Sequence, residues 1–337
     1  MPRDSRPARA NAFRCVQNTE LRPLGAGELL DRAVTLFVRR FVPIVIVLAI
    51  TIVPLFVLQA IATPESAHIF NDMGRILAAA GNAGTTRDPT ADLEKLNAGL
   101  LPSIGVALVA ALARLLMWSA IVYVVAMAYI NGTMPTVSDA YKVGVNCWPA
   151  QLLVGIAFSV LGSICLMPLI LLYIGILAGV FALTFLHVNP VITIVFLIVG
   201  IVILFAGFAL VGSFVYMTYE LAAVYVVTEA PNAVAAITAA LRRTASRATW
   251  WRTVVAGLVI LAITQGGLLP LLFLSGLLVA VTHIDALYFA VFGTGTVLLD
   301  GLVAAFVVVY ATDMRIRREG LDLVALTHAP EPQPQPG

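Results

Sequence analysis

Long apolar runs separated by short polar segments dominate the chain from residue 41 onward. A helix needs about 20 consecutive apolar residues to cross a membrane, so this pattern predicts an all-α, polytopic transmembrane bundle with six spans. The third and fourth runs are much longer than one crossing requires. The alternative is that four short crossings replace these two long, bent ones, which gives eight spans in all. The six predicted spans cover about residues 41–62, 103–130, 152–187, 191–228, 253–283 and 287–312.

Three amphipathic segments each precede a pair of spans. In the first, apolar Leu30, Val34 and Phe37 recur at helical spacing, and polar residues occupy the opposite side. We predict that such segments lie as helices along the membrane surface. Because they start near positions 25, 135 and 231, the hypothesis is a threefold repeat of a surface helix plus a helical hairpin. The three predicted interfacial helices cover about residues 27–40, 136–148 and 232–247.

The composition agrees with a protein embedded in lipid. Hydrophobic residues make up 61% of the chain and charged residues 11%, with a mean hydropathy of +0.98, whereas roughly a quarter of the residues in a soluble domain are charged. The net charge of +2 is too small to indicate a nucleic-acid partner. Residues 1–20 and 324–337 lack apolar periodicity and contain several prolines, so we predict disordered tails there.

The basic residues are distributed unequally between the two sides of this layout. The loop after the first span holds Arg75, Arg87 and Lys95, and Arg114 lies inside the second span. The other sixteen of the 20 Lys and Arg residues fall on the side of the tails. Since Lys and Arg accumulate in cytoplasmic loops, we predict that both termini are cytoplasmic.

Ionisable residues inside the spans are the candidate functional site, because each is costly in lipid unless it is paired or hydrated. One interpretation is a polar route or a pocket for a proton, an ion or a lipid head group. The other, which we favour, is structural: an Arg114–Asp300 ion pair fixes helix register, and Glu220 is hydrogen-bonded to tyrosines. The candidate intramembrane polar site comprises Arg114, Glu220, Asp300, Tyr216 and Tyr219.

No common hydrolase or nucleotide-binding motif is present, so we predict no catalytic residue and no cofactor. His187, His283 and Asp285 fall in predicted outer turns and are able to meet there, but two histidines and one carboxylate at unknown distance are a weak metal signal. We therefore predict no metal site.

Two end motifs carry a resemblance to a known family. They are LRPLGAGELLD at residues 21–31 and YATDMRIRREGLDL at residues 310–323, and ITAALRRTASRATWWR at residues 237–252 accompanies them. Together they resemble the membrane-domain family named after glycerophosphoryl diester phosphodiesterase. The resemblance implies a polytopic bacterial membrane protein without an assigned reaction. The family's name comes from proteins that also carry a catalytic barrel, whose residues are not found here, so we expect no phosphodiesterase activity.

These observations predict a non-catalytic membrane-embedded assembly or regulatory partner in a bacterial cytoplasmic membrane. The alternative is a transporter or lipid-handling channel that uses Arg114, Glu220 and Asp300. The expected partners are the lipid bilayer and another membrane protein or a second copy of the chain; no nucleic acid is expected, and the sequence indicates no particular small-molecule substrate. A water-accessible cavity lined by the three ionisable residues would favour the alternative, whereas an uncovered apolar flank would favour the assembly partner.

Overall fold

The computed structural model describes residues 24–62, 89–186, 189–229, 232–247, 249–282 and 286–319. All regular structure within these ranges is helical, and six of the helices are long and apolar enough to cross a membrane. The predicted all-α architecture with six spans is therefore confirmed, whereas the threefold repeat stays a prediction. The helices are α2 (Ala26–Arg39), α3 (Phe41–Ala62), α5 (Pro89–Ile130), α6 (Val137–Phe185), α7 (Pro190–Thr228), α8 (Ala233–Thr244), α9 (Trp250–Thr282) and α10 (Ala286–Glu319).

The two longest apolar runs form one helix each, α6 and α7, so the interpretation as two long helices holds and the alternative of four short ones does not. The prediction of a separate surface helix at residues 136–148 is wrong in its boundary, because this segment is the first part of α6. Thr136 caps the helix by accepting a hydrogen bond from the Asp139 backbone N–H at 3.2 Å. The helix then continues through Pro149, since a proline inside a long apolar helix does not have to end it. The predicted tails lie outside the described residues.

The helices pack as successive neighbours around α10. Helix α6 packs against α5 and α7, α7 packs against α9, and α10 contacts α9, α3 and α2. Two of these contacts depend on glycine. A Cβ atom on Gly257 of α9 would collide with the Ser213 carbonyl oxygen of α7, and one on Gly144 of α6 would lie 2.9 Å from the Leu116 carbonyl oxygen of α5. Helix backbones therefore approach closely at both places.

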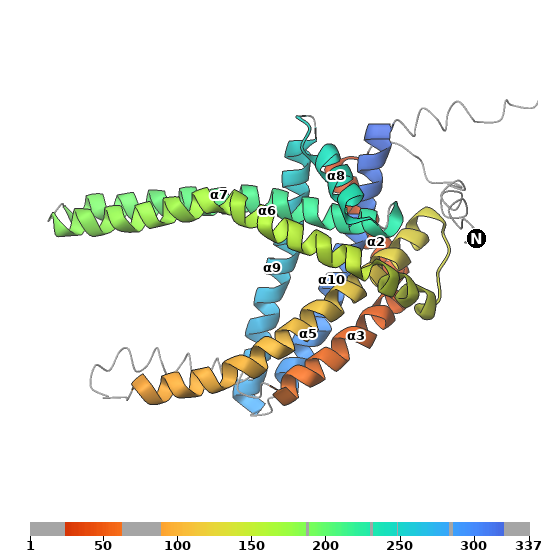
Figure 1. The fold of residues 1–337 in the computed structure, drawn as a ribbon, viewed down its shortest axis with the longest axis horizontal. Coiled ribbons are helices and arrows are strands. Elements are labelled where there is room, and N and C mark those ends of the chain that lie inside the picture. The colour runs from red at the N-terminus through yellow and green to blue at the C-terminus, as the bar shows by residue number, and fades with distance from the viewer. Residues whose placement is uncertain are drawn as a thin grey trace, which may run out of the picture.

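Buried residues gather at one end of the bundle. They include the stretches from Met117 to Ala126 in α5, from Leu221 to Val226 in α7 and from Val303 to Tyr310 in α10. We call this region, which α2 and α8 cover, the packed end. Figure 1 shows α2 and α8 lying against the ends of the longer helices there. The core of the protein therefore sits at one end of its spans and not along their whole length.

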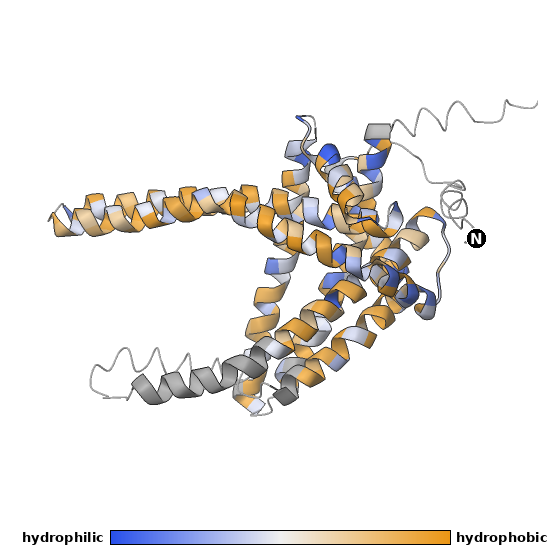
Figure 2. Cartoon of the chain, in the orientation of Figure 1, coloured by the Kyte–Doolittle hydropathy of each residue, from blue (hydrophilic) through white to orange (hydrophobic). Residues whose placement is uncertain are grey.

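Residues 163–185 of α6 and 190–212 of α7 form a two-helix projection that we call the arm. In Figure 1 the arm extends away from the other helices, and in Figure 2 it is apolar along nearly its whole length. Its large side chains are exposed on the protein surface, with Phe181 74% and Phe205 71% accessible. Within the arm, α6 and α7 contact each other, and Ile176 fills the space beside Gly200.

Helices α2 and α8 each present one face to the packed end. Leu29 and Ala33 of α2 are buried, whereas Leu30 and Val34, which belong to the predicted apolar stripe, remain exposed on the protein surface. Phe37, the third residue of the stripe, packs beside Gly301 of α10, so the stripe is only partly used for packing within the chain. This arrangement agrees with the prediction that α2 lies against lipid, because a protein face left apolar next to a membrane has acyl chains to cover it.

Candidate functional site

The structure brings the three ionisable residues of the spans close to one another. Arg114 comes from α5 and Asp300 from α10, and Arg114 Nη2 lies 3.8 Å from Asp300 Oδ2. The ion pair that the sequence suggests between them is present. It is loose, because 3.8 Å is too long for a hydrogen bond, and the Arg114 side chain is 60% exposed against 23% for Asp300.

Glu220 lies deeper, on α7, and is 4% exposed. Tyr216, one helical turn earlier, interacts with it, and Asp300 is close enough for its charge to act on both residues. Glu220 Oε2 and the Trp118 indole N–H are both buried and interact with each other, but their geometry does not meet that of a hydrogen bond. Tyr219, which we predicted to contact Glu220, packs edge-on against Phe158 with ring centroids 5.9 Å apart. Glu220 is therefore only partly satisfied by its neighbours.

A cavity of about 590 Å³ lies beside this cluster and opens on one side. Helices α5, α6 and α7 form its wall, which is apolar apart from a few hydroxyl groups; Ala111, Leu115, Ile156, Ser159, Tyr216 and Tyr219 are among its lining residues. Arg114, Glu220 and Asp300 do not line it. The cavity therefore suits an apolar group and is not a polar route through the bundle.

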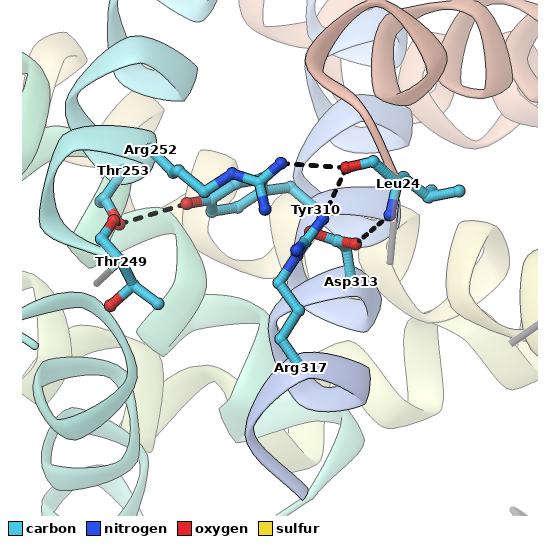
Figure 3. Close-up of polar contacts among 7 residues, drawn as sticks. All are labelled: Leu24, Thr249, Arg252, Thr253, Tyr310, Asp313 and Arg317. Atoms are coloured by element: carbon cyan, nitrogen blue, oxygen red, sulfur yellow. Dashed lines mark hydrogen bonds and ion pairs between the residues drawn. The ribbon is translucent and has the colours of Figure 1, made fainter. Parts of the chain in front are cut away.

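The packed end contains a polar contact that the sequence did not reveal. Asp313 of α10 is 1% exposed, and its Oδ1 accepts a hydrogen bond from the Leu24 backbone N–H at 2.7 Å. The Leu24 carbonyl oxygen accepts from Arg317 Nη2 at 2.6 Å and from Arg252 Nη2 at 3.0 Å, as Figure 3 shows. Arg317 Nε also donates to Asp313 Oδ2 at 2.8 Å. We call Leu24, Arg252, Asp313 and Arg317 the clamp.

The clamp joins the three motifs that carry the family resemblance. Leu24 belongs to the first, Arg252 to the second, and Asp313 and Arg317 to the third. Both backbone groups of one residue are held by side chains from α9 and α10, which fixes where the chain enters α2. The four-residue spacing of Asp313 and Arg317 is typical of a helix ion pair, and it is the only signal in the sequence that pointed here. Nothing in the sequence indicates that the backbone of Leu24 is their partner.

A second ion network ties α8 to α7 and α10. Glu229 Oε1 lies 2.7 Å from Arg243 Nη1 and 3.2 Å from Arg315 Nε. The Arg243 guanidinium also sits over the Tyr225 ring, 4.4 Å from its centroid. Burial is the largest single influence and acts to lower the pKa of Arg243, but the hydrogen bonds and charges of Glu229 and Tyr225 together outweigh it, and the pKa is raised. Arg243 is therefore a permanently charged anchor for α8.

The described residues show no group of three His, Cys, Asp or Glu side chains placed to hold a metal ion. His187, His283 and Asp285, the weak metal candidate of the sequence, lie outside the described residues. Known protein families, curated proteins and solved structures give no match to this chain. The resemblance to the membrane-domain family therefore stays a prediction, and the geometry alone has to indicate a function.

Proposed function

We propose that the protein is a non-catalytic integral membrane protein that serves as an assembly or regulatory partner of another membrane protein, with the arm as its docking element. The observation that carries this proposal is the contrast between the two ends of α6 and α7. At the packed end these helices are enclosed by their neighbours, whereas residues 163–185 and 190–212 project away from the other described helices and leave their large apolar side chains exposed. Each arm helix has about 23 residues, or roughly 35 Å, enough to cross the bilayer.

The arm surface has the features that membrane helices use for association. A methyl group added at Gly175 would meet no other atom within 4 Å, and Ser163 is exposed, so small residues leave backbone accessible on α6. Close approach at small residues is a main source of helix affinity in lipid, where the hydrophobic effect does not favour protein over acyl chains. The occupant that fits this surface is an apolar helix of another membrane protein; a second copy is the rival outcome.

The packed end supports the arm, because α6 and α7 continue from it into the arm. Its basic residues, among them Arg40, Arg243 and Arg252, lie next to α2 and α8. Because basic residues stay on the cytoplasmic side, the packed end faces the cytoplasm in this proposal. The membrane is then a bacterial cytoplasmic membrane, as the resemblance implies.

A transporter that uses Arg114, Glu220 and Asp300 is the alternative. Transport requires these side chains to border a route for the substrate, but the cavity beside them is lined by Tyr216 and Tyr219 and by apolar residues. The loose Arg114–Asp300 pair forms a contact between α5 and α10, which requires no route through the bundle. The geometry thus gives the assembly partner more support than the transporter.

The test is site-specific photo-crosslinking in cells. A photoreactive side chain is placed on the arm, at Phe181 or Ile198, and at Ile50 of α3, which is also exposed, as the control. We expect a discrete protein adduct from the arm positions and only lipid adducts from Ile50. Lipid adducts at every position would overturn the proposal, and an adduct of the chain with itself would identify the partner as a second copy.

A matched pair of glycine variants sharpens this test. An added Cβ atom meets no other atom within 4 Å at Gly175 on the arm or at Gly105 on α5, so Gly175→Leu and Gly105→Leu are a matched pair. Gly175→Leu should abolish the adduct because the leucine keeps the partner helix away, and Gly105→Leu should leave it unchanged. Equal adduct yields in the two variants would mean that the partner helix does not pack against Gly175.

A further inference from the structure

We propose that the cavity between α5, α6 and α7 binds one acyl chain of a phosphatidylethanolamine, whose phosphate and ammonium groups are held by Arg114 and Asp300. This site is independent of the docking proposed for the arm. The cavity lies where the arm meets the packed end, with Leu166 and Gly212 of the arm among its lining residues, and filling it requires no protein partner.

The cavity has the size and lining of a ligand site. Its volume of about 590 Å³ falls within the range of roughly 300–1,000 Å³ that is typical of small-molecule pockets. Its wall is apolar and it opens on one side, so a hydrocarbon chain is able to enter from the lipid without passing through the bundle. In a bilayer the molecules that fit this description and are always present are the lipids themselves.

Arg114 does not line the cavity itself, but it is next to the part of α5 that does. Ala111, three residues before it, and Leu115, directly after it, both line the wall. On the far side Asp300, its ion-pair partner, acts through its charge on Tyr216, which also lines the wall. A head group at Arg114 and Asp300 is therefore continuous with a chain in the cavity.

The depth of Arg114 places it within reach of the opposite leaflet. Arg40 donates a hydrogen bond to the Gly132 carbonyl oxygen at 3.3 Å, which sets the end of α5 level with the basic end of α2. Arg114 precedes Ile130 by sixteen residues, about 24 Å along the helix, whereas the hydrocarbon core is about 30 Å thick. A long Arg side chain is able to extend the remaining distance to the head groups.

Charge complementarity selects the head group. The guanidinium has five N–H donors, and its one described ionic partner is a carboxylate at 3.8 Å, so most of its donors are left for a phosphate. Asp300 is 23% exposed and is able to accept from an ammonium. A head group that carries both charges matches the Arg114–Asp300 pair, whereas a purely anionic head group is repelled by Asp300. A quaternary ammonium cannot donate hydrogen bonds to the carboxylate.

The experiment uses the purified full chain in detergent with phospholipids that carry a photoreactive group on one acyl chain. Phosphatidylethanolamine, phosphatidylcholine and phosphatidylglycerol analogues are compared at equal concentration, and the labelled peptides are mapped. We expect the ethanolamine lipid to label α5, α6 and α7 around the cavity about tenfold more than the other two, which corresponds to one charge-assisted contact. Equal labelling by all three lipids would overturn the head-group assignment.

Variants separate the site from general lipid contact. Ser159→Phe fills the cavity, and Ser163→Phe, one turn further along α6 and outside the lining, is its control. Ser159→Phe should lower cavity labelling about tenfold, and Ser163→Phe should not. Because neither touches the ion pair, these variants decide the proposal even where a charge variant fails to fold. Unchanged labelling in Ser159→Phe would overturn it.

The charge variants give an effect that a merely structural ion pair does not produce. Asp300→Asn removes the repulsion of anionic lipid, so the preference should change from the ethanolamine lipid to phosphatidylglycerol. Arg114→Gln should lower labelling by both. If Asp300→Asn leaves the order of the three lipids as it was, Asp300 does not contact the head group and the assignment is wrong.

Discussion

The arm consists of parts of α6 and α7, two helices that also extend into the packed end, and only the packed end has a core. Val307 of α10 is 0% exposed, whereas Val202 of α7, in a stretch that is just as apolar, is 61% exposed. In lipid, apolar side chains gain little by leaving acyl chains for protein. What distinguishes the packed end is its polar and close-backbone contacts, namely the clamp, the Glu229 network and the approach at Gly257. The difference teaches that such contacts, and not hydropathy, hold these helices together.

The largest effect that tests this comparison is expected at the clamp. Asp313→Ala leaves the Leu24 N–H and the Arg317 guanidinium without their buried acceptor. We expect the free energy of unfolding to fall by about 3 kcal/mol, as for other broken buried pairs. Reversible unfolding in mixed micelles with SDS measures this. Asp31→Asn, in the exposed part of α2, is the control and should leave the midpoint unchanged.

The next effect concerns the contact between α7 and α9. In Gly257→Ala the new methyl group collides with the Ser213 carbonyl oxygen, which belongs to a helix backbone and has little freedom to move. The expected loss is about 2 kcal/mol, measured by the same unfolding. Gly266→Ala on the same helix meets open space and should be neutral. Equal stability of the two variants would mean that the packed end does not depend on this close approach.

A matched pair of valine variants compares the two regions directly. Val307→Ala removes buried methyl groups and leaves a void at the packed end, so it should cost about 1–2 kcal/mol. Val202→Ala removes methyl groups that face outward from the arm, so its unfolding midpoint should remain at the wild-type value. A similar loss for Val202→Ala in the purified chain would show that the arm is covered even in the absence of another protein.

The smallest effect is expected at the boundary between the two regions. Asp300→Asn removes the loose ion pair with Arg114 and should lower stability by about 1 kcal/mol. Arg114→Gln in the same chain should restore part of the loss, because the arginine is then no longer unpaired. The double-mutant cycle is read from unfolding midpoints. Full stability of the single variant would show that the pair does not fix helix register.

The sequence anticipated much of the site. Arg114 and Asp300 were expected to meet because both fall near the middle of their spans, and they lie 3.8 Å apart. Glu220 was expected to form hydrogen bonds with two tyrosines; Tyr216 is such a partner, whereas Tyr219 packs on Phe158 and is affected only by the charge of Glu220. The clamp was missed because its acceptor and donor on Leu24 are backbone groups, which every residue has. The start of α6 was missed because the pattern changes from amphipathic to wholly apolar near residue 149. Such a change marks where the chain enters lipid, but the helix continues across it.

Hydropathy and helix length by themselves determined that this chain forms six long apolar helices with amphipathic segments beside them, because these properties depend on residues close together in the sequence. Which parts of those helices are enclosed was decided only by the tertiary structure. Burial at the packed end depends on contacts such as that between Leu24 and Asp313, which are 289 residues apart. No local pattern records such contacts, and the cavity beside Arg114 exists only where three helices meet.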